Sequence, residues 1–316
     1  MKREPKIQGL AVTAVLVALV AAAAVRSTNV QAADTKYKVI ENWAQLPNGG
    51  AWGTMSAVDI DPRNGTIYVF RRSEPASIMA FDSKGKFLRS WGDTKMFPSA
   101  HGLRVDRDGN VWITDRGVHQ VMKFSPAGKL LLELGRKGVK GDNDSKDALN
   151  GPSDVVIAKN GDIFVSDGES TNTRVVKFSK DGKLIKFWGV KGSGPGQLDV
   201  PHSIAMDSKG LLYVADRANK RIQVFDQDGK HISQTADAGT PYGIFITKND
   251  MMYVVDGTDA QDMVVINLKD GKVVEKMTGL KGPHMISVDS RGAIYIAETT
   301  GKAVRKFERD TTSRTN

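Results

Sequence analysis

Three of the five histidines occupy the same position in a repeated pattern of the sequence. Each lies eight residues before the glycine of a turn: His101 before Gly109, His202 before Gly210 and His284 before Gly292. Three neutral imidazoles that face one point bind Zn²⁺ or another divalent transition metal, and they leave a coordination position open for catalysis. The pattern predicts a metal site if the fold brings the three positions together. Otherwise, each histidine only forms a hydrogen bond at the end of a strand or lines a water-filled channel.

Arginines recur at a second position, just after the acid that ends a short apolar segment. Arg116 and Arg217 hold this position, and Arg72 lies nearest to it in the first repeat. Arginine binds carboxylates through two parallel hydrogen bonds, which lysine cannot reproduce. These arginines would therefore hold a substrate carboxylate, or each would pair with a neighbouring acid such as Asp115 or Asp216. For Arg116 the pairing role is favoured.

Both positions belong to a unit that the sequence repeats six times. Each unit has an apolar strand segment with a central aromatic residue: Tyr68, Trp112, Phe164, Tyr213, Tyr253 and Tyr295. A second alternating segment and a Gly-Lys turn, such as Gly128-Lys129, follow in most units. Glycine suits these hairpin turns because it adopts positive φ readily. Four short antiparallel strands per ~45 residues are typical of a β-propeller blade, so we predict an all-β, six-bladed propeller over residues 33–310.

The two ends of this segment are expected to close the ring. The last unit stops near Val304 to Phe307, and the segment from Tyr37 to Trp43 alternates like a strand without a unit of its own. Pairing the two would remove two exposed sheet edges. The histidines then fall on alternate blades of a ring of six, which directs them to the central axis. The other blades carry different residues at this position: Ser56 or Ala57, Ser153 and Tyr242.

The composition excludes several kinds of site. The sequence contains no cysteine, so it has no disulfide, thiolate metal site or cysteine nucleophile. The formal net charge of +9 comes largely from scattered lysines, which favours a solvated periphery over nucleic-acid binding. His119 and His231 lie outside the histidine pattern and are expected at the surface.

The start of the chain has the three-part pattern of a secretory signal peptide. Basic residues up to Lys6 precede an apolar run from Leu10 to Val25, and small residues follow at Val30-Gln31-Ala32. We therefore expect residues 1–32 to direct export, and the protein to be periplasmic or secreted and monomeric. Contact with a membrane is expected only if this segment stays uncleaved as an anchor. Residues 311–316 are expected to be a disordered tail.

The repeat units resemble NHL repeats, and the chain from about Ala51 to Phe307 resembles the peptidyl-α-hydroxyglycine α-amidating lyase family. The resemblance rests on strings in matching order: His101-Gly102-Leu103, Trp112-Ile113-Thr114-Asp115, Val165-Ser166-Asp167-Gly168, Pro201-His202-Ser203, Val214-Ala215-Asp216-Arg217 and Pro283-His284. Enzymes of this family cleave a peptidyl-α-hydroxyglycine into an amidated peptide and glyoxylate. The resemblance implies that His101, His202 and His284 bind zinc and that Arg72 and Arg217 line the substrate site.

Two positions depart from the pattern of this family. Where the family has a tyrosine that acts as the catalytic base, this chain has Glu169. We expect a surface-like glutamate here, and a carboxylate with an ordinary pKa of about 4.3 is a weak base for an alcohol. Tyr242 occupies the position in its blade that the three histidines occupy in theirs, and it is the other candidate base. Alternatively, its side chain only fills the central channel. Met285 stands where the family has an aspartate that helps hold Ca²⁺. A thioether is a poor ligand for a hard cation, so structural Ca²⁺ is not expected.

Three functions are compatible with these features. The favoured one is an exported metal-dependent lyase that cleaves a peptidyl-α-hydroxyglycine or a related α-hydroxy-acid adduct. Its substrate would be a small molecule or a peptide that carries a carboxylate. The alternatives are metal-dependent hydrolysis of an ester or lactone at the same axial site, and a non-catalytic NHL propeller that binds or scaffolds. The fold alone does not separate them.

Overall fold

The computed structural model describes Met1, residues 37–258 and residues 260–310. Apart from Met1, the predicted export segment lies outside the described residues, as does the predicted tail. The described chain consists of strands, turns and two short 3₁₀ helices, η1 (Pro47–Gly49) and η2 (Arg217–Asn219). Among these residues, no helix has the length and hydropathy that a membrane crossing requires.

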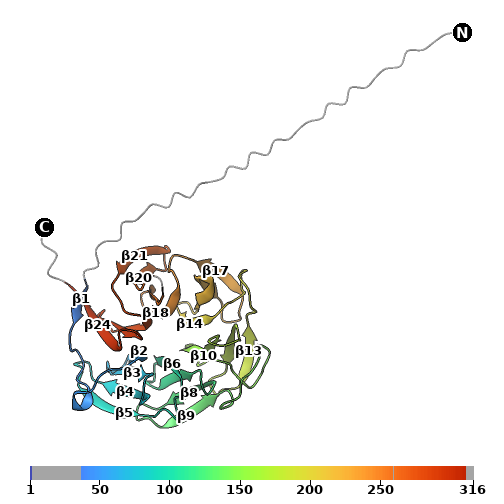
Figure 1. The fold of residues 1–316 in the computed structure, drawn as a ribbon. Coiled ribbons are helices and arrows are strands. Elements are labelled where there is room, and N and C mark those ends of the chain that lie inside the picture. Colours follow the sequence, from blue (N-terminus) through green and yellow to red (C-terminus); the bar gives the residue numbers. More distant parts are fainter. Residues whose placement is uncertain (2–36, 259, 311–316) are drawn as a thin grey trace, which may run out of the picture. The chain divides into compact units, whose positions relative to one another are not determined.

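The strands form six four-stranded antiparallel sheets, which are the blades of a propeller (Figure 1). Blade one contains β2 (Met55–Ile60), β3 (Ile67–Arg71), β4 (Ser77–Phe81) and β5 (Phe87–Trp91). Blade two contains β6 (Ala100–Val105), β7 (Val111–Asp115), β8 (Gln120–Phe124) and β9 (Leu130–Leu134). Blade three contains β10 (Pro152–Ile157), β11 (Ile163–Asp167), β12 (Arg174–Phe178) and β13 (Leu184–Trp188).

The remaining blades follow the same order until the last one. Blade four contains β14 (Pro201–Met206), β15 (Leu212–Asp216), β16 (Arg221–Phe225) and β17 (His231–Thr235). Blade five contains β18 (Pro241–Ile246), β19 (Met251–Asp256), β20 (Met263–Asn267) and β21 (Lys272–Met277). Blade six contains β22 (Pro283–Val288), β23 (Ile294–Glu298), β24 (Ala303–Arg309) and, from the other end of the chain, β1 (Tyr37–Ile40).

The ring closes through both its centre and its rim. At the centre, the first strand of each blade contacts the first strands of the two neighbouring blades, and β22 contacts β2. At the rim, β1 pairs antiparallel with β24, with Tyr37 opposite Arg309. This pairing covers an edge of β24 that would otherwise be free to pair with another chain.

The hydrophobic core lies between adjacent blades. One cluster, for example, joins Ala57 and Phe70 of blade one to Leu103, Ile113 and Met122 of blade two. Because the strands are short and alternate with a period of two, each sheet buries apolar side chains against both neighbours. The six blades thus hold one another in a fixed orientation around the axis.

A bulge in each innermost strand explains why one column of residues can face the axis. The pairing register skips the second residue of the inner strand in five blades, which is Ser56 in blade one, and in blade two it skips both His101 and Gly102. Blades three to six have the same one-residue shift as blade one. A bulge leaves its residue unpaired and re-aims the side chain, so these residues point away from the blade cores.

In blades two to six, an acidic residue at the end of the second strand accepts a hydrogen bond from a backbone N–H just before the inner strand. The Asp115 carboxylate, for example, accepts a hydrogen bond from the Ser99 N–H at 2.9 Å, and Asp216 accepts one from Asp199 N–H at 2.6 Å. Blades three, five and six use Asp167, Asp256 and Glu298 in the same way. These acids therefore brace the backbone directly before the axial column.

Candidate metal centre

The histidines of blades two, four and six converge at the propeller axis. The potential ligand atoms of His101, His202 and His284 all lie within 4.8 Å of one another. The ring centroids are 4.7 to 4.9 Å apart, and the three residues are at most 4% exposed. The structure thus brings together the three residues that the sequence pattern singled out.

Each imidazole is oriented by a backbone carbonyl of the next blade. The Nδ1 atom of His101 lies 2.8 Å from Ser153 O, that of His202 lies 2.8 Å from Tyr242 O, and that of His284 lies 2.6 Å from Ser56 O. A carbonyl oxygen can only accept, so each Nδ1 must carry the proton and donate it. The Nε2 atoms are then left with lone pairs, the form in which a second-shell partner prepares histidine for a metal.

The surroundings favour the neutral form of the His202 and His284 imidazoles. Burial, together with the nearby His101 ring and Arg217, lowers the pKa of His202 well below its usual value, although Glu169 opposes this. Burial, His101 and Arg72 lower the pKa of His284 in the same way. The Nε2 atoms of His101 and His202 are buried and take part in no hydrogen bond. Buried polar atoms without partners are uncommon, and a divalent transition metal would satisfy them because imidazole is a preferred ligand of such metals.

Four charged side chains surround the histidines from the loops that follow the second strands of blades one to four. The Nη1 atoms of Arg116 and Arg217 each lie 2.8 Å from a carboxylate oxygen of Glu169. Arg72 donates from Nε to Ala100 O at 2.8 Å, and its Nη2 lies 3.3 Å from His284 Nε2. Burial and the charge of Arg116 lower the pKa of Arg72 to about 10. Within the described chain, Arg72 pairs with no carboxylate.

The expectation that Glu169 is a surface-like residue is wrong. Its side chain is only 6% exposed and lies beside the metal-site histidines. Burial raises the pKa of this carboxyl, but the neighbouring positive charge of the Arg217 guanidinium lowers it, and the pKa lies well below the usual range. The pairing expected between Arg116 and Asp115, and the alternative pairing of Arg217 with Asp216, are replaced by pairing of both arginines with Glu169.

The backbone explains why Glu169 is inside the site. The N–H groups of Gly168 and Glu169 both donate to Gly151 O, at 3.2 and 2.8 Å. A Cβ atom at Gly168 would lie 2.4 Å from Pro201 Cδ, so only glycine fits there. The loop is therefore fixed, and it turns the Glu169 side chain toward the axis. The sequence did hold a signal for this placement. Glu169 lies two residues after the acid that ends its strand, whereas Arg116 and Arg217 directly follow the corresponding acids.

Tyr242 also borders the site. Its ring centroid is 4.7 Å from that of His202 and 5.9 Å from that of His284. The Arg217 guanidinium lies over the Tyr242 ring, 4.7 Å from its centroid. The tyrosine therefore packs against two metal-site imidazoles and one arginine.

Two further expectations about histidines are wrong. His119 is buried, and its Nδ1 accepts a hydrogen bond from Gly151 N–H at 3.2 Å. His231 is half-buried, with its ring centroid 5.7 Å from that of Phe225. Both were expected at the surface because they lie outside the axial histidine pattern, but packing between blades buries side chains there as well. Met285 is buried in the apolar cluster that contains Ala57 and Leu103.

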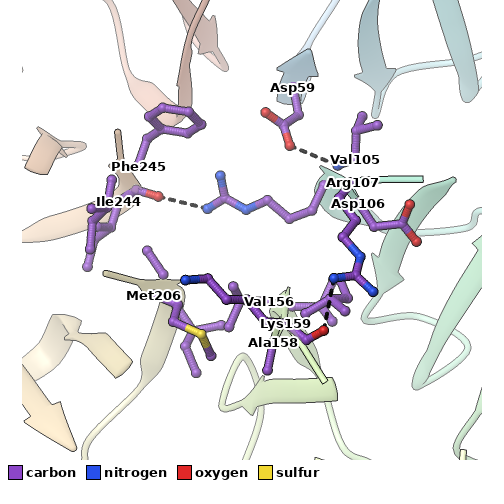
Figure 2. Close-up of a pocket in the computed structure, with 16 residues that line it drawn as sticks. Asp59, Val105, Asp106, Arg107, Val156, Ala158, Lys159, Met206, Ile244 and Phe245 are labelled. Carbon is purple, nitrogen blue, oxygen red and sulfur yellow. Dashed lines mark hydrogen bonds between the residues drawn. The ribbon is translucent and has the colours of Figure 1, made fainter. Parts of the chain in front are cut away.

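The opposite end of the inner strands holds a different pocket (Figure 2). It has a volume of about 290 Å³, and its walls include Val156, Met206 and Phe245. Arg104 lies at this end, paired through Nε and Nη2 with the two oxygens of Asp154 at 3.0 and 2.6 Å. Its Nη2 also donates to Ile244 O at 2.8 Å, so this ion pair ties blades two, three and five together. The pocket and the metal centre are separate features of the axis.

Comparisons with known proteins agree with the repeat architecture. The NHL repeat model matches residues 97–124, 149–178 and 198–225. NHL repeat-containing protein 3 of Homo sapiens is 31% identical over 293 residues, which cover 86% of this chain and 84% of that protein. Peptidyl-alpha-hydroxyglycine alpha-amidating lyase 2 of Drosophila melanogaster is 29% identical over 299 residues, covering 82% and 71%.

Solved structures support the fold. A streptogramin B lyase structure superposes with a TM-score of 0.60 at 16% identity, over 86% of this chain and 97% of that chain. At this identity the likeness concerns the fold alone. The sequence relatives carry the family assignment: the chain belongs to the NHL-repeat propellers, the family of NHL repeat-containing protein 3, and it is a homologue of the peptidyl-α-hydroxyglycine α-amidating lyases.

Proposed function

We propose that this protein is an exported, metal-dependent lyase that cleaves a peptidyl-α-hydroxyglycine or a related α-hydroxy-acid adduct and releases glyoxylate or its analogue. The observation that carries the proposal is the convergence of three Nε2 lone pairs beside an arginine that pairs with no carboxylate in the described chain. Homology to the amidating lyases supports the reaction class.

In this proposal His101, His202 and His284 hold the metal. When bound, a divalent metal supplies Lewis acidity toward the substrate hydroxyl. The carbonyls of Ser153, Tyr242 and Ser56 keep the imidazoles oriented, which fixes the ligand atoms before the metal arrives. Zn²⁺ is the ion we expect.

Arg72 would bind the substrate carboxylate. Its Nη atoms face the histidines, and its fork geometry suits bidentate binding. Arg116 and Arg217 are less available because each already pairs with Glu169. Their side chains remain 40% and 23% exposed, so this end of the axis faces solvent.

Tyr242 is the better candidate for the residue that takes the hydroxyl proton. Glu169 is held ionised by its neighbours, and a carboxylate whose pKa is this low accepts protons poorly. Tyr242 packs against His202 and His284 and therefore lies near any substrate bound there.

The experiment is to purify the mature protein, measure bound metal by mass spectrometry and assay glyoxylate release from a synthetic α-hydroxyglycine peptide. We expect one metal ion per chain and release that a chelator abolishes and zinc restores. A fully metal-loaded protein that releases no glyoxylate would refute the lyase. N-terminal sequencing of the protein from the culture medium or periplasm tests export, because cleavage should remove residues 1–32.

A second candidate is a propeller that holds a metal without catalysis. The pairing of Glu169 with Arg116 and Arg217 favours it, since this carboxylate occupies two of the three arginines that would otherwise bind a substrate. Metal binding without glyoxylate release is its expected result.

A further inference from the structure

We propose that Glu169 is a fourth protein ligand of the metal, so that the axial site presents three imidazoles and one carboxylate. The inference rests on the metal site of the proposed function and goes beyond it. It assigns to Glu169 a role different from that of a catalytic base.

Distances to two histidines carry the inference. Glu169 Oε1 lies 3.5 Å from His202 Nε2, and Oε2 lies 3.6 Å from His101 Nε2. Both distances exceed the range of an N–H···O hydrogen bond. Two ligand atoms that each lie about 2.1 Å from a tetrahedral ion are roughly 3.4 Å apart. Each carboxylate oxygen is therefore spaced from one of the two imidazoles as two ligands of the same ion would be.

The facing atoms of this contact are unpaired. Within the part of the chain that the structure describes, the Nε2 atoms of His101 and His202 have no hydrogen-bond partner, and neither does Glu169 Oε1. Because Nδ1 carries the proton in each ring, Nε2 is an acceptor, and the carboxylate is an acceptor too. Acceptors that face each other in a buried site repel unless a cation lies between them.

The arginines orient the carboxylate without using all of its lone pairs. An ionised carboxylate has about four lone-pair sites. Arg116 donates to Oε2 at 2.8 Å, and Arg217 lies 2.8 Å from Oε1 as an ion pair. The remaining lone pairs can bind metal. Arg116 and Arg217 are thus positioning residues for Glu169, as outer partners are for ligands at many metal sites.

The carboxylate covers only one side of the site. Glu169 lies beside His101 and His202, whereas Arg72 lies beside His284. A substrate carboxylate bound by Arg72 would approach the metal from the side opposite Glu169. A fourth ligand is compatible with catalysis in this arrangement, because zinc can expand to five-coordination.

The test compares wild type with Glu169→Gln, Glu169→Asp and the matched control Glu275→Gln, which alters a half-buried, arginine-paired glutamate on the outer strand β21. Cobalt(II) is the probe, and its visible absorption reports the ligand set. We expect Glu169→Gln to shift the cobalt band and to lower affinity by more than the roughly 10- to 100-fold that losing an outer-shell partner costs. Glu169→Asp should also lose affinity, because the fixed loop keeps its shorter side chain away from the ion. Glu275→Gln should match wild type.

The outcomes separate this inference from the proposed function. A Glu169→Gln band identical to that of wild type, or full affinity in Glu169→Asp, overturns the ligand role but leaves the three-histidine site. Wild-type protein that binds neither cobalt nor zinc refutes both. If the variants do not fold, a crystal structure of zinc-loaded wild type decides. We expect a Glu169 oxygen about 2.0–2.2 Å from zinc, and an oxygen beyond roughly 3 Å overturns the inference.

Discussion

Replacement of His202 by alanine is the most direct test of the axial metal site. The side chain is fully buried, and its Nδ1 is fixed by Tyr242 O. Alanine removes one ligand but does not touch the carbonyls that orient His101 and His284. The variant should therefore keep the propeller and lose most of its metal affinity.

The size of the loss follows from the number of ligands. Four-ligand structural zinc sites bind with about 10–16 kcal/mol, which is roughly 2.5–4 kcal/mol per ligand. Since 1.4 kcal/mol corresponds to a tenfold change in affinity, His202→Ala should weaken zinc binding about 100- to 1,000-fold.

The assay is a zinc titration against a competing chelator, supported by thermal unfolding. At a free zinc concentration of 1,000 times the wild-type Kd, zinc stabilises wild type by about 4.1 kcal/mol. The variant should gain only roughly 0.4–1.4 kcal/mol at the same concentration. His231→Ala is the matched control, because His231 lies in blade four but outside the axial site. Stoichiometric zinc held by His202→Ala within threefold of the wild-type Kd would refute the three-histidine site.

Three further substitutions have specific expected outcomes. Arg72→Lys should raise KM for a carboxylate substrate about tenfold while kcat changes little, because lysine cannot form the fork; an equal KM in steady-state assays counts against carboxylate binding at Arg72. Tyr242→Phe should lower kcat about 100-fold or more with metal retained, and an unchanged kcat would place the base elsewhere. Asp154→Ala leaves buried Arg104 uncompensated and should lower the free energy of unfolding by about 3–5 kcal/mol; a loss below ~1 kcal/mol in denaturant titrations contradicts this role.

The sequence predicted the architecture because the same local signals recur in every blade. Period-two strands, turn glycines and aromatic positions each specify one strand or hairpin, and six repetitions leave few alternatives. Gly128 and Gly229 adopt φ of 86° and 82°, as a hairpin turn requires. The histidine column was visible because every blade places its bulge at the same residue.

The contacts between blades could not be predicted in this way. Neither the carbonyl that orients each imidazole nor the burial of His119 follows from a pattern within one blade. Glu169 illustrates the same limit, because its environment comes from Gly151, Arg116 and Arg217, which belong to different loops. Its residue type indicated an exposed weak base, whereas its neighbours make it a buried, ionised carboxylate.

The ring divides the axial histidine cluster between two kinds of blade. Blades two, four and six supply imidazoles, and blades three, five and one supply the backbone carbonyls that orient them. A carbonyl does not depend on the side chain of its residue. Substitutions at Ser56, Ser153 and Tyr242 can therefore change what lies beside the three histidines without removing an imidazole or the carbonyl that orients it. The surroundings of the histidine cluster can thus change at Tyr242 and Glu169 while the cluster itself stays the same.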